Sequence, residues 1–309
     1  MLHQLGKIFS DFSLFFFLVI IVVAGQLSNP LFLSPATIYT IIRGTACLGF
    51  LALGEVLVII SRGIDLSVGQ IACLSSVIVV YFMIMFQSPL IAIVLTLLMG
   101  LGFGVLSGTL VNIGIPPFLA TLGTMWIAQG LAEYLGVKPT PVPSHFSSFN
   151  IISFETPPVT AIILILISVI SLEILATKVP IGRYIYYVGG NEYGTYISGV
   201  DVKLIKYIIY SFSGFSASIG GILLTSWTTS GYKWVALGQE FTAIAASVIG
   251  GASLAGGEGR VFKTIIAMVL LITISSLYTF LGLPPTLFFL TEGFLILGAA
   301  LFQIKFRRG

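Results

Sequence analysis

Ten long apolar segments, separated by short breaks, make up most of this sequence of 309 residues. A bilayer core about 30 Å thick requires roughly 20 apolar residues for each helical crossing. Only helices and closed barrels satisfy every backbone polar group in lipid, and these apolar runs are continuous rather than alternating. The sequence therefore predicts an all-α, polytopic membrane protein with about ten transmembrane helices in a single domain, residues 1–309. The expected spans are residues 12–28, 40–60, 64–86, 90–111, 117–135, 159–176, 207–226, 238–254, 264–282 and 286–303.

The composition excludes a water-soluble globule. The chain is 57% hydrophobic and 8% charged, with a mean hydropathy of +1.10, whereas a soluble domain carries about 25% charged residues. Membrane lipid is therefore an expected partner. The net charge is only +3 and no basic run is present, so nucleic-acid binding is not indicated.

The positions of the cationic residues predict the orientation in the membrane, because Lys and Arg collect in cytoplasmic loops. With the N-terminus inside, the outer loops keep only Arg43, Lys138 and Lys233. The inner loops then carry Lys7, Arg62, Lys178, Arg183, Lys203, Lys206, Arg260, Lys263, Lys305, Arg307 and Arg308. We therefore expect both termini in the cytoplasm. The first apolar run resembles a signal peptide in part, but the charge bias and the many later spans favour an uncleaved first span.

Two loops are longer than the others. The expected outer loop, residues 136–158, contains five prolines and His145, and serves either as a connector or as a contact surface for an external partner. The expected inner loop, residues 177–206, contains Asn191 as a good N-cap, Glu192 in a first turn and Gly199 at a C′ position. This pattern predicts a helix of about two turns, which either packs at the interface or docks a soluble subunit.

Small residues recur at four-residue spacing in two expected spans: Gly100, Gly104 and Gly108, then Ser213, Ala217 and Gly221. Such faces allow close helix packing in lipid. A short similarity between residues 66–70 (LSVGQ) and 236–239 (ALGQ) favours an inverted repeat, because spans five apart in a ten-span chain run in opposite directions.

Motifs for covalent chemistry are absent from the sequence. Residues 256–264 resemble a phosphate loop, but Phe262 stands where a Walker A motif has Gly, and no hydrophobic strand precedes it. Cys47 and Cys73 lie in expected spans and form no CxxC motif or Cys/His cluster. We expect no metal site, no disulfide, no cofactor and no enzyme activity, so that any energy for transport must come from elsewhere.

Four charged residues in or beside the apolar spans are candidates for a translocation path or gate: Glu55, Arg62, Asp65 and Glu240. A charge in lipid is expensive, so an intramembrane ionisable residue points to function. Arg62 and Asp65 lie at a break in an apolar run and are expected either to pair with each other or to lie at the interface. Glu240 lies near the outer end of a small-residue helix that ends in a glycine-rich stretch, residues 250–259.

Several separate motifs resemble those of the permease subunits of ribose-type sugar ABC importers. Their order and spacing match over nearly the whole chain. The motifs are GIDLSVG at 63–69, PPFLATLGTM at 116–125, GRY at 182–184, GGN at 189–191, SGV at 198–200, and EFTAIAA with GGASLAGGEG within 240–259.

The resemblance implies half of a dimeric translocation pore for a small sugar, a pentose or a hexose, in a bacterial inner membrane. It implies three protein partners: a cytoplasmic ATP-binding subunit, an external sugar-binding protein and a second permease copy, identical or a sister chain. It also implies that residues 191–199 form the coupling helix that docks on the ATPase. The residues expected to carry this coupling are Asn191, Glu192, Tyr193, Tyr196, Ile197 and Gly199.

The chain departs from the family pattern at two places. Gly194, Thr195 and Tyr196 stand where the family usually has Ala-Ala and a basic residue, and Gly and Thr are poorer helix formers than Ala. Glu55 and Arg62 stand where Met and Gly are common, which would make the translocation path more polar than usual.

Two functions of other classes remain open from the sequence. One is an autonomous secondary carrier in which Glu55 or Asp65 couples transport to protons. The other is a membrane enzyme for a lipid-linked substrate. The lack of clustered polar residues at one membrane face argues against this enzyme.

Overall fold

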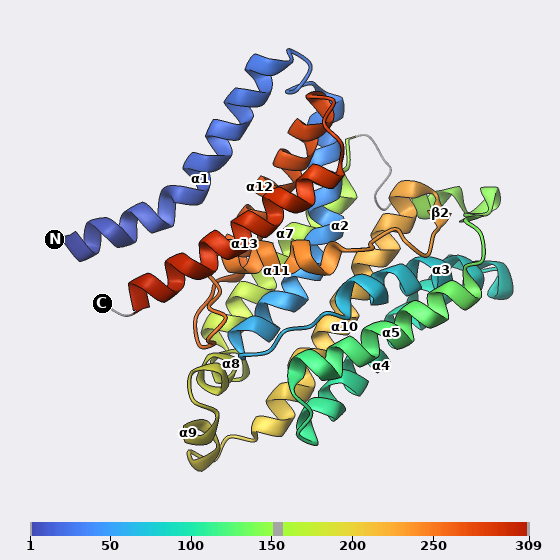
Figure 1. Ribbon diagram of the computed structural model, residues 1–309. Coiled ribbons are helices and arrows are strands. Elements are labelled where there is room, and N and C mark those ends of the chain that lie inside the picture. Colours follow the sequence, from blue (N-terminus) through green and yellow to red (C-terminus); the bar gives the residue numbers. More distant parts are fainter. Residues whose placement is uncertain (1, 151–156, 308–309) are drawn as a thin grey trace.

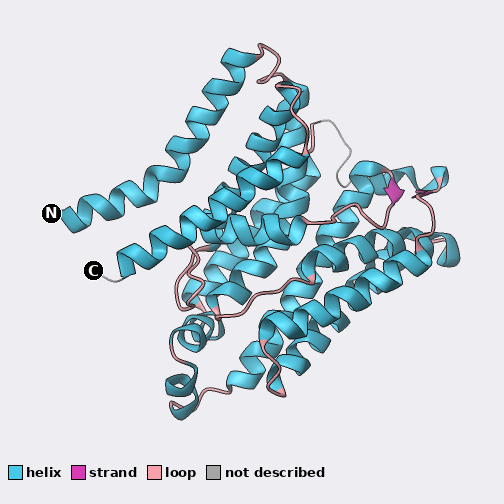
Figure 2. Ribbon diagram, viewed as in Figure 1, coloured by secondary structure: helices cyan, strands magenta, loops and turns pink. Residues whose placement is uncertain are grey.

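The computed structural model describes residues 2–150 and 157–307, and it is almost entirely helical (Figures 1 and 2). The described elements are α1 (Leu2–Ser28), α2 (Pro35–Ile60), α3 (Val68–Phe86), α4 (Pro89–Asn112), α5 (Pro117–Leu135), β1 (Thr140–Pro141), η1 (Ser144–Asn150), α7 (Val159–Lys178), α8 (Pro180–Gly190), α9 (Glu192–Ile197), α10 (Val202–Thr228), β2 (Ser230–Gly231), α11 (Gln239–Ile249), α12 (Val261–Phe280) and α13 (Thr286–Arg307).

Six described helices are long and apolar enough to cross a membrane: α2, α3, α4, α7, α10 and α12. Shorter apolar stretches occur at Leu14–Ser28 within α1 and at Thr286–Ala299 within α13. These helices make the chain a multi-pass, all-α membrane protein, as the sequence predicts.

The helix expected to span the membrane at residues 238–254 is shorter than predicted. It is α11, which has 11 residues and is therefore about 16 Å long, roughly half of a bilayer core. The flanking segments, residues 232–238 and 250–260, are not helical. Gly238 and Gly251, at the two ends of α11, have φ values of 80° and 93°, which helical residues do not adopt.

Helix starts follow the local sequence. Ser34 accepts a hydrogen bond from the backbone N–H of Thr37, and Asp201 accepts one from that of Leu204, so that each side chain caps an N-terminus. Proline occupies the first position of α2, α4, α5 and α8. It fits there because the first residue of a helix needs no N–H donor. The capping pattern explains why α10 begins at Val202, several residues before the expected start at 207.

Helix α2 forms the centre of the molecule, in contact with α7, α10, α11 and α12. Every residue from 44 to 60 in α2 is buried. At Gly54, an added Cβ would lie 2.8 Å from the Cα of Ser213 in α10. The backbones of α2 and α10 therefore approach each other as closely as only glycine permits.

The small-residue faces expected from the sequence do pack closely. On α4, an added Cβ would lie 2.6 Å from the Gly214 carbonyl oxygen at Gly100, and 2.2 Å from the Tyr210 carbonyl oxygen at Gly104. On α10, a Cβ at Gly221 would lie 2.3 Å from the carbonyl oxygen of Ala72 in α3. Van der Waals packing at such faces is what joins helices in lipid.

The expected outer loop folds against one end of the bundle, opposite α8 and α9 (Figure 1). Strands β1 and β2 pair antiparallel, with Thr140 opposite Gly231. Phe149 is buried in a small apolar cluster with Val79 and Met83 of α3, and His145 is exposed. The part of this loop at 151–156 lies outside the described residues.

Gly104→Ala should destabilise the protein, because the new Cβ would meet the backbone of α10 rather than a flexible side chain. Overpacking of this kind costs about 1–3 kcal/mol. Gly102→Ala on the same helix is the matched control, since nothing lies within 4 Å of its Cβ position. The free energies of unfolding of both variants in detergent micelles would check the prediction. Equal values would show that the α4–α10 contact is looser than described.

Candidate functional site

Asp65 is the centre of a buried polar cluster between α2, α3 and α10. Its side chain is fully buried. Oδ1 accepts hydrogen bonds from the backbone N–H of Ser67 (2.9 Å) and from its hydroxyl (2.5 Å), and Oδ2 accepts one from the Ser213 hydroxyl (2.7 Å). Charge-assisted bonds of this number can hold a carboxylate inside a protein. The cluster fixes the non-helical segment before α3 against α10.

Glu55 lies beside this cluster, on α2. It is fully buried, and its Oε1 accepts a hydrogen bond from the backbone N–H of Asp65 (3.2 Å). Its Oε2 has no hydrogen-bond partner among the described residues. The structure thus brings Glu55 and Asp65 together, as two carboxylates in the protein interior rather than at a lipid-facing edge.

The expected ion pair between Arg62 and Asp65 is not formed. Asp65 is bonded to serine side chains as described above, whereas Arg62 is exposed and has a left-handed backbone with φ of 69°. This reversal of the chain directs the two side chains apart, so Arg62 fits the other expectation, a place at the surface. It lines a cavity of about 270 Å³ together with Glu192, Lys206 and Tyr210.

Glu240 lies away from the Asp65 cluster, in the first turn of α11. A Cβ added to Gly69 would lie 2.0 Å from Glu240 Oε2 and 3.1 Å from the carbonyl oxygen of Ala236. The start of α3 and the start of α11 therefore meet directly. These are the two segments whose short similarity favoured an inverted repeat.

Helix α9 has the caps that the sequence predicts. Asn191 Oδ1 accepts a hydrogen bond from the backbone N–H of Gly194 (2.8 Å), and Gly199 has a φ of 85°. Glu192 forms an ion pair with Lys206 of α10 (2.7 Å), which ties the short helix to its neighbour. Thr195 points inward and is buried.

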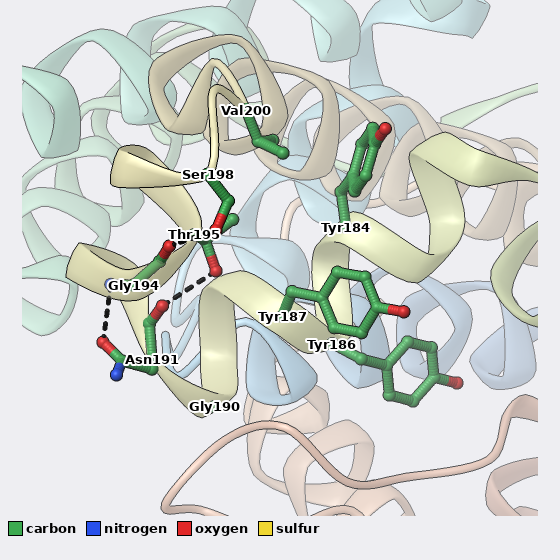
Figure 3. Close-up of a pocket in the computed structure, with 9 residues that line it drawn as sticks. All are labelled: Tyr184, Tyr186, Tyr187, Gly190, Asn191, Gly194, Thr195, Ser198 and Val200. Carbon is green, nitrogen blue, oxygen red and sulfur yellow. Dashed lines mark hydrogen bonds between the residues drawn. The ribbon is translucent and has the colours of Figure 1, made fainter.

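The outer face of α9 is apolar and unprotected. Tyr193, Tyr196 and Ile197 are 73%, 67% and 65% exposed. A groove of about 540 Å³ runs between α8 and α9 and is lined by tyrosines of α8, namely Tyr184, Tyr186 and Tyr187 (Figure 3). Exposed aromatic residues beside a groove are typical of a protein-binding surface.

Helix α8 joins this surface to the core through glycines. A Cβ on Gly189 would lie 1.8 Å from the Ile60 carbonyl oxygen and 2.6 Å from the Gly257 nitrogen. The Gly257 N–H donates a hydrogen bond to that same Ile60 oxygen (2.8 Å). The ends of α2 and α8 and the 250–260 segment thus meet backbone to backbone, and we call this contact the glycine junction (Ile60, Gly189, Gly256, Gly257).

A tyrosine reinforces the glycine junction from α8. The Tyr186 hydroxyl donates a hydrogen bond to the Gly259 carbonyl oxygen (3.2 Å). Burial, followed by the negative charge of Glu173, raises the pKa of Tyr186, so this hydroxyl keeps its proton and remains a donor. Tyr186 also lines the groove, so this bond links the groove to the glycine junction.

No group of three or more His, Cys, Asp or Glu side chains is placed to hold a metal ion within the part of the chain that the structure describes. Cys47 and Cys73 are both buried and form no disulfide.

Sequence reasoning missed several polar residues of the interior. The sequence predicts Ser213 only as a helix-packing residue, and Thr242 and Glu292 are not among the predicted site residues. Glu292, in α13, is 3% exposed, and a single glutamate within an expected span was a signal for it. The sequence also does not predict helix α8, because its first turn, Pro180 to Arg183, has the sequence of a loop.

Comparison with known proteins gives one family and several relatives. Residues 37–300 match the family described as "Branched-chain amino acid transport system / permease component". The chain is 37% identical over 293 residues to the ribose import permease protein RbsC of Bacillus subtilis (strain 168), covering 93% of this chain and 91% of that protein. Identity is 34% to RbsC of Haemophilus influenzae, covering 87% and 85%. It is 33% to the D-allose transport system permease protein AlsC of Escherichia coli (strain K12), covering 86% and 82%. No solved structure matches the chain.

Gly189→Ala should loosen the glycine junction, because its Cβ would overlap the backbone of Ile60 and Gly257. We expect faster amide hydrogen exchange in α8 and α9 with less change in α4 and α5, since local opening follows local packing. Gly190→Ala is the matched control, because nothing lies within 4 Å of its Cβ position. Unchanged exchange in Gly189→Ala would contradict the close contact described here.

Proposed function

Because this chain belongs to the family of permease components that its residues 37–300 match, we propose that it is the membrane-spanning permease subunit of an ATP-driven, binding-protein-dependent importer of a small sugar. The family match confirms the resemblance seen in the motifs. The observation that carries the proposal is the 37% identity to a ribose import permease over 93% of the chain. The chain is a permease and not an enzyme, so ATP hydrolysis belongs to another subunit.

The substrate class follows from the relatives. Two of them are named for ribose, a pentose, and one for D-allose, a hexose. We therefore propose a neutral pentose or hexose as the substrate.

Three protein partners complete the proposed importer. A cytoplasmic ATP-binding subunit would dock on α9 and its groove, with Tyr193, Tyr196 and Ile197 as anchors and with Asn191, Glu192 and Gly199 shaping the helix. An external sugar-binding protein would deliver the sugar. A second permease copy, identical or a sister chain, would form the other half of the pore. The exposed aromatic face of α9 supports the first of these.

About ten crossings of a bacterial inner membrane, with both termini in the cytoplasm, are part of the proposal. Helices α1, α5 and α13 would add to the six apolar helices, and the tenth crossing would be discontinuous. In it, residues 232–238 enter from the end that carries β1 and β2, α11 covers the middle, and residues 250–260 leave at the glycine junction. Non-helical backbone at membrane depth is tolerated where protein buries it, which fits this crossing. The meeting of α3 and α11 supports an inverted repeat, and the core that joins α1 to α13 supports one domain, residues 1–309.

The residues proposed for the translocation path or gate are Glu55, Arg62, Asp65 and Glu240. Glu55 and Asp65 lie in the core next to the non-helical segment before α3, and Arg62 opens onto the cavity beside Lys206. Glu55, with one unpartnered oxygen, also keeps a second candidate function in view: a proton-coupled carrier that acts alone.

Reconstitution tests the two candidates directly. Proteoliposomes that contain the permease, an ATP-binding subunit and a sugar-binding protein should import D-ribose or D-allose only with ATP. The permease alone should import neither sugar when a proton gradient is imposed. Uptake by the permease alone would favour the carrier and overturn the importer.

The proposed orientation predicts how single cysteines react in a background where Cys47 and Cys73 are replaced. His145→Cys should react with an impermeant maleimide added to intact cells, because that residue is exposed in the proposed outer loop. Tyr193→Cys should react only after the cells are opened, although this residue is 73% exposed. The opposite pattern would invert the topology.

Double replacement Tyr196→Ser and Ile197→Ser should uncouple ATP hydrolysis from import. Interface anchors contribute about 2 kcal/mol or more each, so binding of the ATP-binding subunit should weaken more than tenfold. The measurements are co-purification and sugar-stimulated ATPase activity of the reconstituted complex. Leu204→Ser, at a 53% exposed apolar residue outside α9, is the control. Full stimulation in the double variant would remove α9 from the coupling interface.

A further inference from the structure

Three buried polar side chains meet where α11 begins, between α3 and α13. Glu240 and Thr242 lie in the first turn of α11, and Glu292 lies in the second turn of α13. They are 4%, 1% and 3% exposed. We call these three side chains the α11 cluster.

The α11 cluster is held together by close packing of the surrounding helices. Glu240 Oε2 rests against Gly69, where a Cβ would come within 2.0 Å of it. Glu292 lies within electrostatic range of Glu240, and the Thr242 hydroxyl neighbours the Glu292 carboxylate. On the other side, a Cβ on Gly238 would lie 3.9 Å from Cε1 of Phe289, one turn before Glu292. Side chains from two helices thus converge against the start of a third.

Each side chain of the α11 cluster has one oxygen atom for which the described part of the structure shows no hydrogen-bond partner. Glu240 Oε2, Thr242 Oγ1 and Glu292 Oε1 have no hydrogen-bond partner among the described residues. Seven buried side-chain atoms are unpartnered in the described part of the chain, and three of them belong to the α11 cluster. Buried polar groups are otherwise nearly always hydrogen-bonded, and an unpartnered carboxylate oxygen is the most expensive kind. Glu240 Oε2 and Glu292 Oε1 therefore remain carboxylate oxygens that no donor of the described chain satisfies.

The chemistry of a matching donor is set by what else the region offers. The backbone N–H groups of Gly238 and Glu240 are engaged by the Glu240 carboxylate, whereas the Thr242 hydroxyl, which can both donate and accept, lies beside the Glu292 carboxylate. Donors and acceptors thus lie side by side. A hydroxyl group is both donor and acceptor, whereas a metal ion or an ammonium group accepts no hydrogen bond. Neighbouring hydroxyls on one small molecule match this arrangement best.

We propose that the α11 cluster binds hydroxyl groups of the translocated sugar, with Glu240, Glu292 and Thr242 as their hydrogen-bond acceptors. This inference rests on the proposed function, which makes the substrate a neutral, polyhydroxylated monosaccharide. Helix α11 lies across the middle of the molecule (Figure 1), so the cluster is a mid-path site between delivery and release. The described conformation is closed at this point, and the sugar reaches the oxygens when α11 separates from α3 or α13.

The test is import by proteoliposomes that hold the whole complex, with D-ribose, D-allose and their singly deoxygenated analogues as probes. The variants are Glu240→Gln, Glu292→Gln and Thr242→Val. Loss of a hydrogen bond to a charged group should slow import at saturating sugar by about tenfold or more in each glutamine variant. At least one deoxygenated analogue should be imported more slowly than its parent sugar by the wild-type complex, and this difference should shrink in the variants.

A double-mutant cycle combines the amino-acid substitution with the removal of one sugar hydroxyl. The coupling between these two changes distinguishes a direct contact with the sugar from a structural role of the side chain. The sugar-binding protein is the same in every complex, so its own preference for the parent sugar cancels. Glu133→Gln and Thr273→Val are the matched controls. Glu133 is exposed and bonded to Gln129 of its own helix (3.0 Å), and Thr273 is buried but donates to the Val269 carbonyl oxygen of its own helix (2.7 Å). Both should behave as wild type.

The outcomes separate this inference from the function beneath it. If the wild-type complex imports sugar with ATP and all three variants keep its rates and its preference for the parent sugar, the α11 cluster is no sugar site and the importer stands. If the wild-type complex imports neither sugar, the proposed function fails and the site fails with it. If a glutamine variant does not assemble, Thr242→Val, which preserves the volume of the side chain, tests the proposal instead. The measurement is the ratio of the import rates of the parent sugar and its deoxygenated analogue, and an unchanged ratio would overturn the sugar site.

Discussion

The contact between α2 and α10 at Gly54 determines where the polar groups of the interior can lie. Because Gly54 has no Cβ, the Ser213 backbone approaches α2 closely enough for its hydroxyl to reach Asp65 Oδ2 at 2.7 Å. The same approach places the hydroxyl of Tyr210 under Gly63, where a Cβ would come within 2.5 Å of it. A larger residue at position 54 would separate the helices and withdraw the donor from a buried carboxylate. Van der Waals packing between apolar helices thus controls the electrostatics of the loop beside them.

Two non-helical segments inside the bundle show how irregular backbone is kept away from lipid. Before α3, the Thr121 hydroxyl accepts from the Leu66 N–H (3.2 Å) and lies 3.0 Å from the Ile64 carbonyl oxygen. Before α11, the N–H of Tyr232 donates to Ser76 Oγ (3.1 Å) and that of Ala236 donates to Cys73 Sγ (3.3 Å). Side chains of neighbouring helices replace the hydrogen bonds that a continuous helix would make. Because these segments are not helical, a change in their shape would leave the flanking helices intact, as the proposed path would require.

Features encoded within a few residues could be predicted from the sequence. Six of the apolar spans, the α9 caps at Asn191 and Gly199, and the close packing at Gly100 and Gly104 depend on local pattern, and the structure has these features. Features that depend on distant segments could not be predicted. The length of α11 is set by Gly238 and Gly251, whose positive φ values end the helix on both sides although glycine need not adopt such values. Asp65 is bonded not by Arg62 but by Ser213, 148 residues later in the sequence. Glu292 joins Glu240 only when α13 packs on α11.

The glycine junction connects three points that are far apart in the chain, and this has a consequence for biosynthesis. Gly257 lies after Ile60 and Gly189 in the sequence, so the hydrogen bond from Gly257 to Ile60 can form only after the ribosome has passed residue 257. Until then α8 and α9 have no backbone anchor at the end of α2. A truncated nascent chain therefore contains its first helices while the α8–α9 hairpin still lacks this hydrogen bond. The junction closes only on a chain that is nearly complete, and so a partner that needs a fixed α9 would pass over unfinished copies.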